Sequence, residues 1–95
     1  MTPEGKIKQE VKDWLNEIGA YWFMPVQMGY GQKTLDFLVC YKGRFIGIET
    51  KRPGGQMTKF QLNIAHFIAE CGGRSLLISC ERDLEIARAM LEAYE

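Results

Sequence analysis

The sequence predicts an α/β domain in which helices flank a mixed four-stranded sheet, with the element order αβββαβα. Two observations lead to this class. Apolar residues recur at helical spacing near both ends and in the middle of the chain, and stretches rich in β-branched and aromatic residues lie between them. A chain of 95 residues with 46% hydrophobic and 25% charged side chains supports one modest core. We therefore expect residues 1–95 to form a single domain.

The first helix begins after Thr2, a residue type that caps helices well, and Gly19 ends it. Its apolar residues recur every three or four positions and form one face: Ile7, Val11, Trp14, Leu15 and Ile18. Residues 20–27 follow as an aromatic and β-branched strand. Because Pro25 has no backbone N–H to donate, we expect this strand at an edge of the sheet.

Residues 35–41 and 44–51 read as the two strands of a hairpin, with Lys42-Gly43 as its tight turn. A two-residue turn fixes the register of the hairpin, so that Asp36 lies opposite Glu49. Like charges that face each other on one side of a sheet repel, and something has to offset that repulsion.

The second half of the chain reads as helix, strand, helix. Thr58 begins a helix that Gly72-Gly73 closes, and its apolar stripe is Phe60, Ile64, Phe67, Ile68 and Cys71. Residues 75–79 form a short strand of buried character, which the crossover helix lays parallel to strand 44–51. Residues 81–94 form the last helix, with an apolar stripe of Leu84, Ala87, Leu91 and Tyr94.

Composition excludes several classes of function. Twelve basic and twelve acidic residues cancel, which argues against avid, indiscriminate binding to nucleic acid or anionic lipid. The three cysteines have no zinc-site spacing, no signal peptide or long apolar run is present, and the single histidine, His66, makes a catalytic triad improbable. We expect reduced core cysteines, an exposed His66, an intracellular, cytoplasmic location and no membrane association.

Asp36, Glu49 and Lys51 are the candidate site residues. Alternation along the strand puts Lys51 on the same face as Glu49, so two carboxylates and an ammonium converge at one end of the hairpin. A divalent cation bridging the carboxylates removes their repulsion, and oxygen ligands of this kind suit Mg²⁺ or Mn²⁺. The alternative is a solvated cluster in which Lys51 neutralises the two acids.

The first helix offers a third carboxylate. At 100° per residue, Glu4 lies within about 60° of Ile7, the middle of the apolar stripe, and Glu10 lies at a similar angle on the other side. Glu4 has the better claim, and Glu10 stays open. Glu4 also has a structural explanation, since an acidic residue is favourable at a helix N-terminus.

Asp36, then Glu49-Thr50-Lys51 on the next strand, then a helix carrying Gln61, resembles the D, E-x-K pattern of the PD-(D/E)XK nuclease superfamily. Within it, "EGKIKQEVKDWL", "LDFLV", "GIETKRPGG" and "TKFQ" are similar to the virus-type replication-repair nuclease domain, VRR-NUC. The likeness spans nearly the whole chain and implies a stand-alone domain with a restriction-endonuclease-like core. Leu35 stands where the superfamily name has proline.

The resemblance implies a metal-dependent phosphodiesterase acting on DNA. It assigns Mg²⁺ or Mn²⁺ to Asp36, Glu49 and the backbone carbonyl of Thr50, with Glu4 at or beside the metal. Lys51 would position and help deprotonate the attacking water, or stabilise the charge that grows on phosphorus. The resemblance further implies a phage- or virus-encoded protein as one source.

Gln61 would orient the water, the phosphate or the lysine. Its spacing from Thr58 also matches a capping box, so a structural role is an alternative, and both roles can coexist. Lys33, Arg52 and Lys59 flank the site and are candidate contacts to DNA phosphates. The stretch "GYGQKT" lacks phosphate-loop spacing, and we expect no nucleotide cofactor. We expect its glycine-containing loop to pass close to the site.

A protein this small offers little surface to grip duplex DNA, so we expect a homodimer, whose paired sites suit branched DNA such as a four-way junction. We expect the aromatic residues Tyr21, Trp22 and Phe23, near the edge strand, to be exposed and to supply its interface. The alternative function is a non-catalytic nucleic-acid-binding module on a nuclease scaffold. A structural subunit of a larger repair or packaging assembly is a weaker alternative.

Overall fold

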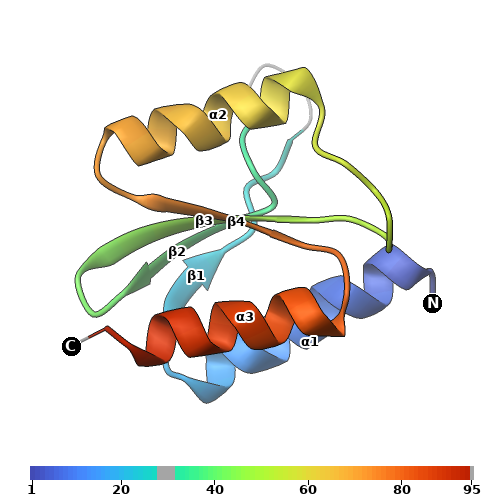
Figure 1. The fold of residues 1–95 in the computed structure, drawn as a ribbon, viewed down its shortest axis with the longest axis horizontal. Coiled ribbons are helices and arrows are strands. Elements are labelled where there is room, and N and C mark those ends of the chain that lie inside the picture. The colour runs from blue at the N-terminus through green and yellow to red at the C-terminus, as the bar shows by residue number, and fades with distance from the viewer. Residues whose placement is uncertain (28–31, 95) are drawn as a thin grey trace.

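The computed structural model describes residues 1–27 and 32–94. Three helices and four strands follow one another in the order αβββαβα, and the strands form one mixed sheet in the order β1-β2-β3-β4. In Figure 1, α2 (Lys59–Glu70) covers one face of the sheet, while α1 (Pro3–Glu17) and α3 (Glu81–Glu92) cover the other. The predicted fold class and element order are confirmed. Within the described residues, no helix is long and apolar enough to cross a membrane.

Side-chain caps form the starts of α1 and α2. The Thr2 hydroxyl accepts a hydrogen bond from the Gly5 amide at 3.0 Å and begins α1. At the start of α2, the Thr58 hydroxyl accepts from the Gln61 amide at 3.1 Å, and the Gln61 side-chain oxygen accepts from the Thr58 amide at 2.9 Å. These reciprocal bonds are the capping box predicted from the Thr58 to Gln61 spacing.

The central hairpin consists of β2 (Phe37–Tyr41) and β3 (Arg44–Thr50), which pair antiparallel in the predicted register. Positive φ angles of 50° at Lys42 and 75° at Gly43 are those of a type I′ turn, which suits the twist of a hairpin. On its other side, β3 pairs in parallel with β4 (Arg74–Ile78), as predicted for strands joined by a crossover helix.

The first strand is shorter than predicted. β1 (Tyr21–Phe23) pairs with β2 over three residues at the edge of the sheet, and residues 24–27 form no strand. Pro25 cannot donate to a ladder, and the Gln27 side chain bonds instead to the Leu35 carbonyl at 3.1 Å and the Thr34 amide at 2.9 Å. The predicted edge position is confirmed. Residues 28–31 of the glycine-containing loop, expected near the site, lie outside the described residues.

The prediction that all three aromatic residues of β1 are exposed is wrong for Trp22. Tyr21 and Phe23 point to solvent, but Trp22 is half-buried against the core, its ring centre 5.6 Å from that of Phe37. The Trp22 indole N–H donates to the Asn16 side chain at 2.9 Å. Strand alternation explains the difference, because the middle residue of three faces opposite to its neighbours.

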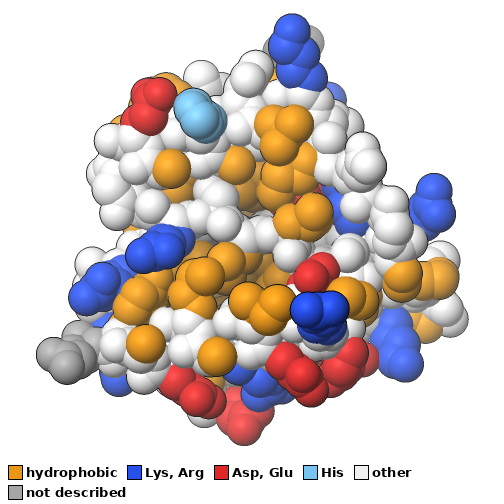
Figure 2. Space-filling model, in the orientation of Figure 1, with side chains coloured by type: hydrophobic (Ala, Val, Ile, Leu, Met, Phe, Trp, Pro, Cys, Tyr) orange, Lys and Arg blue, Asp and Glu red, His pale blue; other side chains and the backbone are white. Residues whose placement is uncertain are grey.

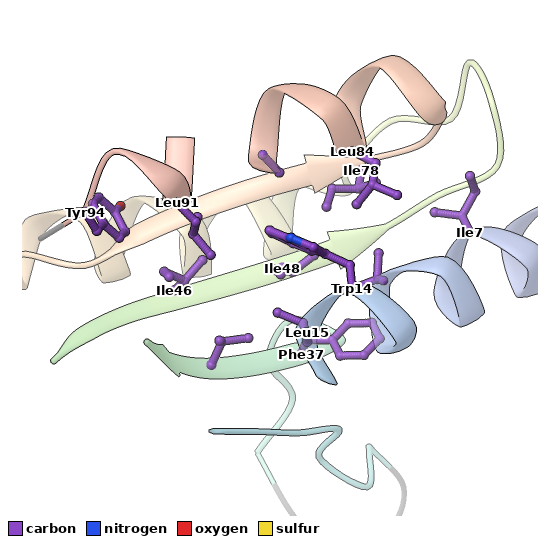
Figure 3. Packing of buried hydrophobic residues seen from close by; sticks show 13 residues of the cluster. Ile7, Trp14, Leu15, Phe37, Ile46, Ile48, Ile78, Leu84, Leu91 and Tyr94 are labelled. Carbon is purple, nitrogen blue, oxygen red and sulfur yellow. The ribbon is translucent and has the colours of Figure 1, made fainter. Parts of the chain in front are cut away.

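The core lies between the sheet and the pair α1 and α3. Figure 3 shows side chains from these helices and from β2, β3 and β4 pointing toward one another. Trp14 of α1 and Ile48 of β3 are fully enclosed, and every residue of the predicted α3 stripe is buried. Burial of this face is the largest favourable contribution to folding, at roughly 25 cal/mol per Å² of apolar surface.

The other face of the sheet is packed more thinly. None of the twelve residues of α2 is buried, and Phe60 and Phe67 of its predicted apolar stripe are exposed. Ile68 approaches the sheet closely, since a Cβ atom added at Gly47 or Gly73 would lie 2.8 or 2.9 Å from it. Figure 2 shows hydrophobic side chains reaching the surface over α2.

Two predictions about burial are wrong. Cys40 and Cys71 are exposed and Cys80 is half-buried, so the cysteines are free but are not core residues. Cys40 points to the thinly covered face of β2, and Cys71 follows the end of α2. β4 is also less buried than its apolar sequence suggests, because it is the second edge strand and only Ile78 is fully enclosed. His66 is exposed, as predicted.

Candidate active site

Asp36 and Glu49 meet at the end of the β2–β3 hairpin that lies away from its turn. Backbone pairing ends at Phe37 and Ile48, so Asp36 is just outside the ladder. Its amide instead donates to the Glu49 carboxylate at 3.1 Å. The structure therefore brings the two acids together as the sequence predicts, through a side-chain bond and not through backbone pairing.

Glu49 is a buried carboxylate with three partners from three segments. It is 3% exposed, and one oxygen accepts from the Asp36 amide while the other accepts from the Gln61 side-chain amide at 2.8 Å. The Lys51 ammonium lies 3.5 Å from that second oxygen. Gln61 is thus both a capping residue and a site residue, which joins the two roles that the sequence left as alternatives.

The pKa of Glu49 is raised above its ordinary value of 4.5. Burial is the main cause, because it removes water from the charged form, and the negative charge of Asp36 adds to it. The Asp36 amide and Lys51 oppose these effects without cancelling them. A positive charge near this carboxylate therefore stabilises its ionised form.

Thr50 orients Asp36, and sequence analysis missed this role of its side chain. One Asp36 oxygen accepts from both the Thr50 hydroxyl at 2.7 Å and the Thr50 amide at 3.1 Å. Thr50 is fully enclosed, so a hydroxyl there needs a partner, and Asp36 supplies it. A buried threonine directly beside an E-x-K glutamate is the signal that could have indicated this bond.

Glu4 reaches the site through a lysine. The Lys8 ammonium lies 3.4 Å from a Glu4 oxygen and 4.0 Å from the Asp36 oxygen that Thr50 holds. Glu10 lies elsewhere, in a separate pocket with Lys6, Cys80 and Glu81, and one of its oxygens is buried with no hydrogen-bond partner among the described residues. The structure thus favours Glu4 over Glu10 as the helix acid near Asp36.

A sharp turn follows Lys51. The Gly55 amide donates to the Arg52 carbonyl at 2.8 Å, Pro53 occupies the second position and Gly54 has a φ of 81°, as in a type II turn. A Cβ atom on Gly55 would lie 3.0 Å from the Lys51 Cβ. The Pro-Gly-Gly sequence therefore lets the chain turn close against Lys51, whose side chain stays 19% exposed.

Asp36 and Glu49 supply two carboxylates at this end of the hairpin, the ligand type that a divalent cation takes. No group of three or more His, Cys, Asp or Glu side chains that could hold a metal is found within residues 1–27 and 32–94. Mg²⁺ needs no such cage, since it commonly uses one or two carboxylates and completes its shell with water and substrate phosphate oxygens. The metal roles of Glu4 and of the Thr50 carbonyl stay predictions.

The three candidate DNA-binding residues are accessible. Lys33, Arg52 and Lys59 are all exposed. Arg52 follows Lys51 directly, and Lys59 is the first residue of α2, the helix that carries Gln61. Lys33 borders a largely apolar groove of about 550 Å³ between α2 and the sheet. Their contact with DNA stays a prediction.

Comparisons of this chain with protein-family models, with curated proteins and with solved structures found no match. The assignment of a function therefore rests on the geometry of the site and on the residue pattern.

Proposed function

We propose that this protein is a metal-dependent DNA nuclease of the VRR-NUC type, with structure-selective endonuclease activity on branched DNA such as four-way junctions. The main support for this proposal is the environment of the Glu49 carboxylate. Burial of this carboxylate beside a second carboxylate costs stability even with the Lys51 ammonium and the Gln61 amide on its oxygen, so a structural role alone does not account for it. A solvated surface cluster, the structural alternative, would leave Glu49 exposed.

Asp36 and Glu49 would hold Mg²⁺ or Mn²⁺, which makes bound water more acidic and offsets charge on the phosphate oxygens. The Lys51 ammonium lies 3.5 Å from a Glu49 oxygen and can donate hydrogen bonds to a water molecule or to phosphate oxygens. We assign to it the positioning of the attacking water and the stabilisation of charge growing on phosphorus. The Gln61 side-chain amide donates a hydrogen bond to a Glu49 oxygen at 2.8 Å and so fixes the orientation of that carboxylate.

The proposed reaction is hydrolysis of a phosphodiester. Water attacks phosphorus, a P–O bond forms, and the P–O bond to the leaving sugar oxygen breaks. The hydroxyl of water stays on phosphorus and its proton ends on the leaving oxygen or in solvent. No redox partner or nucleotide cofactor enters this balance.

A homodimer is part of the proposal. Tyr21, 72% exposed, and Phe23 lie on the edge strand β1, next to exposed Phe45 on the thinly covered face of the sheet. The formal net charge is zero, so two copies do not repel each other. An intracellular site of action, in a cell or during infection by an encoding phage, fits a DNA substrate and free cysteines.

The test is cleavage of labelled single strands, duplexes, flaps and four-way junctions with Mg²⁺, Mn²⁺ or chelator. Wild type is compared with Glu49→Gln, Lys51→Ala and the control Lys12→Ala, which alters a lysine of α1 outside the site. We expect metal-dependent cutting by wild type and control, and a loss on the order of 100-fold or more in both site variants. The substrate cut fastest defines the structural selectivity.

The opposite result defines the alternative function. If the wild type leaves every substrate intact but binds one of them tightly without metal, and both site variants bind equally well, the protein is a binding module. Cleavage that persists in chelator would also contradict the proposal.

A further inference from the structure

Lys8 is a second lysine in the candidate site. It lies on α1, its side chain is 30% exposed, and its ammonium is 3.4 Å from Glu4 and 4.0 Å from Asp36. Lys51, the residue that follows β3, approaches the other carboxylate, Glu49. Two ammonium groups from different segments therefore each approach a different acid of the site.

Fold stability does not explain the position of Lys8. A Glu–Lys pair four residues apart on an accessible helix contributes little, and holding a long side chain in one geometry costs conformational entropy. The contact with Asp36 joins α1 to the end of the hairpin, but Asp36 is already held by two hydrogen bonds from Thr50. Lys8 therefore adds a positive charge to the site, while the orientation of Asp36 is already set by Thr50.

The charges of the site also indicate what Lys8 does. Asp36, Glu49 and Glu4 carry three negative charges against the two positive charges of Lys8 and Lys51. A divalent cation on Asp36 and Glu49 would place like charge close to the Lys8 ammonium, and the two would repel. The flexible four-carbon stem of lysine allows the ammonium to move to another anion, and the phosphate of the bound strand is the anion that arrives with the substrate.

We propose that Lys8 is a DNA-binding residue whose ammonium changes its anionic partner, from the Asp36 carboxylate to a DNA phosphate. It pairs with Asp36 while the carboxylates hold no divalent cation, and it contacts a phosphate of the DNA strand when they do. The inference rests on the proposed nuclease function and deepens it. It adds a cation on α1 that faces the substrate to Lys51 and Arg52, which follow β3. It predicts opposite effects of one substitution on metal binding and on DNA binding.

The first experiment measures binding of Mn²⁺ without DNA, from the electron paramagnetic resonance signal of free Mn²⁺. Lys8→Met should bind Mn²⁺ tighter than wild type, on the order of fivefold, because a competing charge is gone. Lys8→Arg keeps the charge and should bind like wild type. Lys12→Met, on the same helix and outside the site, should also match wild type, whereas Asp36→Asn should bind more weakly.

The second experiment measures binding of a fluorescent four-way junction at several salt concentrations with Mn²⁺ present. The Lys51→Ala background keeps the strand uncut. Adding Lys8→Met should weaken binding and lower the slope of log K against log salt by about 0.7 to 0.9, the loss of one phosphate contact. Adding Lys12→Met should leave the slope unchanged.

The outcomes separate this proposal from the nuclease function. If Asp36→Asn binds Mn²⁺ as tightly as wild type, the metal site itself is wrong. If Asp36→Asn weakens binding but Lys8→Met does not tighten it, or leaves the salt slope unchanged, only the role of Lys8 is overturned. If Lys8 has only a structural role, Lys8→Met should weaken both metal binding and DNA binding. That pattern would also contradict the proposed change of partner from Asp36 to phosphate.

Discussion

At the scale of single residues, the site is built by hydrogen bonds that fix the directions of two carboxylates. Thr50 binds one oxygen of Asp36 twice, and Asp36 and Gln61 each bind one oxygen of Glu49. Partners that orient a metal ligand in this way commonly change metal affinity by about 10- to 100-fold when they are removed. The side chain of Thr50 is therefore as informative to test as the acids themselves.

Thr50→Val removes the hydroxyl and keeps the side-chain volume. The hydrogen bond at 2.7 Å to Asp36 is lost while the amide bond stays, so we expect Mn²⁺ affinity to fall about tenfold. The free energy of unfolding should change by less than about 1.5 kcal/mol. Calorimetric titration and urea unfolding measure the two. Thr34→Val, whose hydroxyl has no partner within the described residues, is the control, and equal affinities in all three proteins would contradict the prediction.

Glu49 should make the stability of the metal-free protein depend on pH. Its pKa is raised in the fold above the ordinary 4.5, so the folded protein binds this proton more tightly than the unfolded chain. The resulting stability is present below about 4.5 and is lost as pH rises through the raised pKa. Glu49→Gln cannot titrate there. Urea unfolding in chelator should show wild type losing stability relative to the variant with rising pH; a constant or growing difference would refute this.

At the scale of elements, one residue in the first turn of α2, Gln61, both caps the helix and completes the site. Gln61 accepts from the Thr58 amide through its oxygen and donates to Glu49 through its nitrogen. The capping box fixes the side chain that then fixes Glu49. An element start that is needed for folding thereby also sets the geometry of the site.

Two substitutions separate these duties. Thr58→Ala removes the cap and should cost about 1 kcal/mol of stability, with cleavage close to wild type at temperatures where the protein is folded. Gln61→Glu keeps an acceptor for the Thr58 amide but places a carboxylate against Glu49. It should lower cleavage on the order of 10-fold or more. Thermal unfolding and cleavage rates measured together check this; parallel losses in both variants would mean that Gln61 acts only as a cap.

At the scale of the whole molecule, the two faces of the sheet differ in their cover. α1 and α3 enclose one face, whereas α2 leaves Phe45, Phe67 and the outward residues of β1 exposed on the other. Contiguous apolar surface of this kind on a small protein commonly marks an interaction site. The proposed dimer uses this surface and leaves the end of β3 with Lys51 accessible.

Tyr21→Glu tests the dimer. Light scattering of the wild type should give twice the chain mass of 10.9 kDa, and the variant should give the mass of one chain, because a charge is costly in an apolar interface. Ile86→Glu changes a hydrophobic residue of α3 that is also exposed and should leave the dimer intact. A wild type that stays monomeric at every concentration would refute the dimer without affecting the metal site.

The sequence by itself determined the elements that local rules govern. Turn chemistry at Lys42-Gly43 set the register of the hairpin, and the Thr58 to Gln61 spacing set the start of α2, since both depend on neighbouring residues alone. The register in turn brought Asp36 to Glu49. The exposure of Cys40 and the thin cover of β4 could not be predicted, because burial depends on which face another element covers.

Only the tertiary structure decided how the site is completed. The Thr50 hydroxyl on Asp36, the link from Glu4 through Lys8, and the Gln61 amide on Glu49 join residues far apart in the sequence. The Thr50 bond forms within the β2–β3 hairpin, whereas the contacts of Lys8 and Gln61 depend on how α1 and α2 dock against the end of the sheet. Hydrophobic periodicity predicts that these helices dock, but not which polar side chains meet when they do, because burial of apolar surface is non-directional while hydrogen bonds are not.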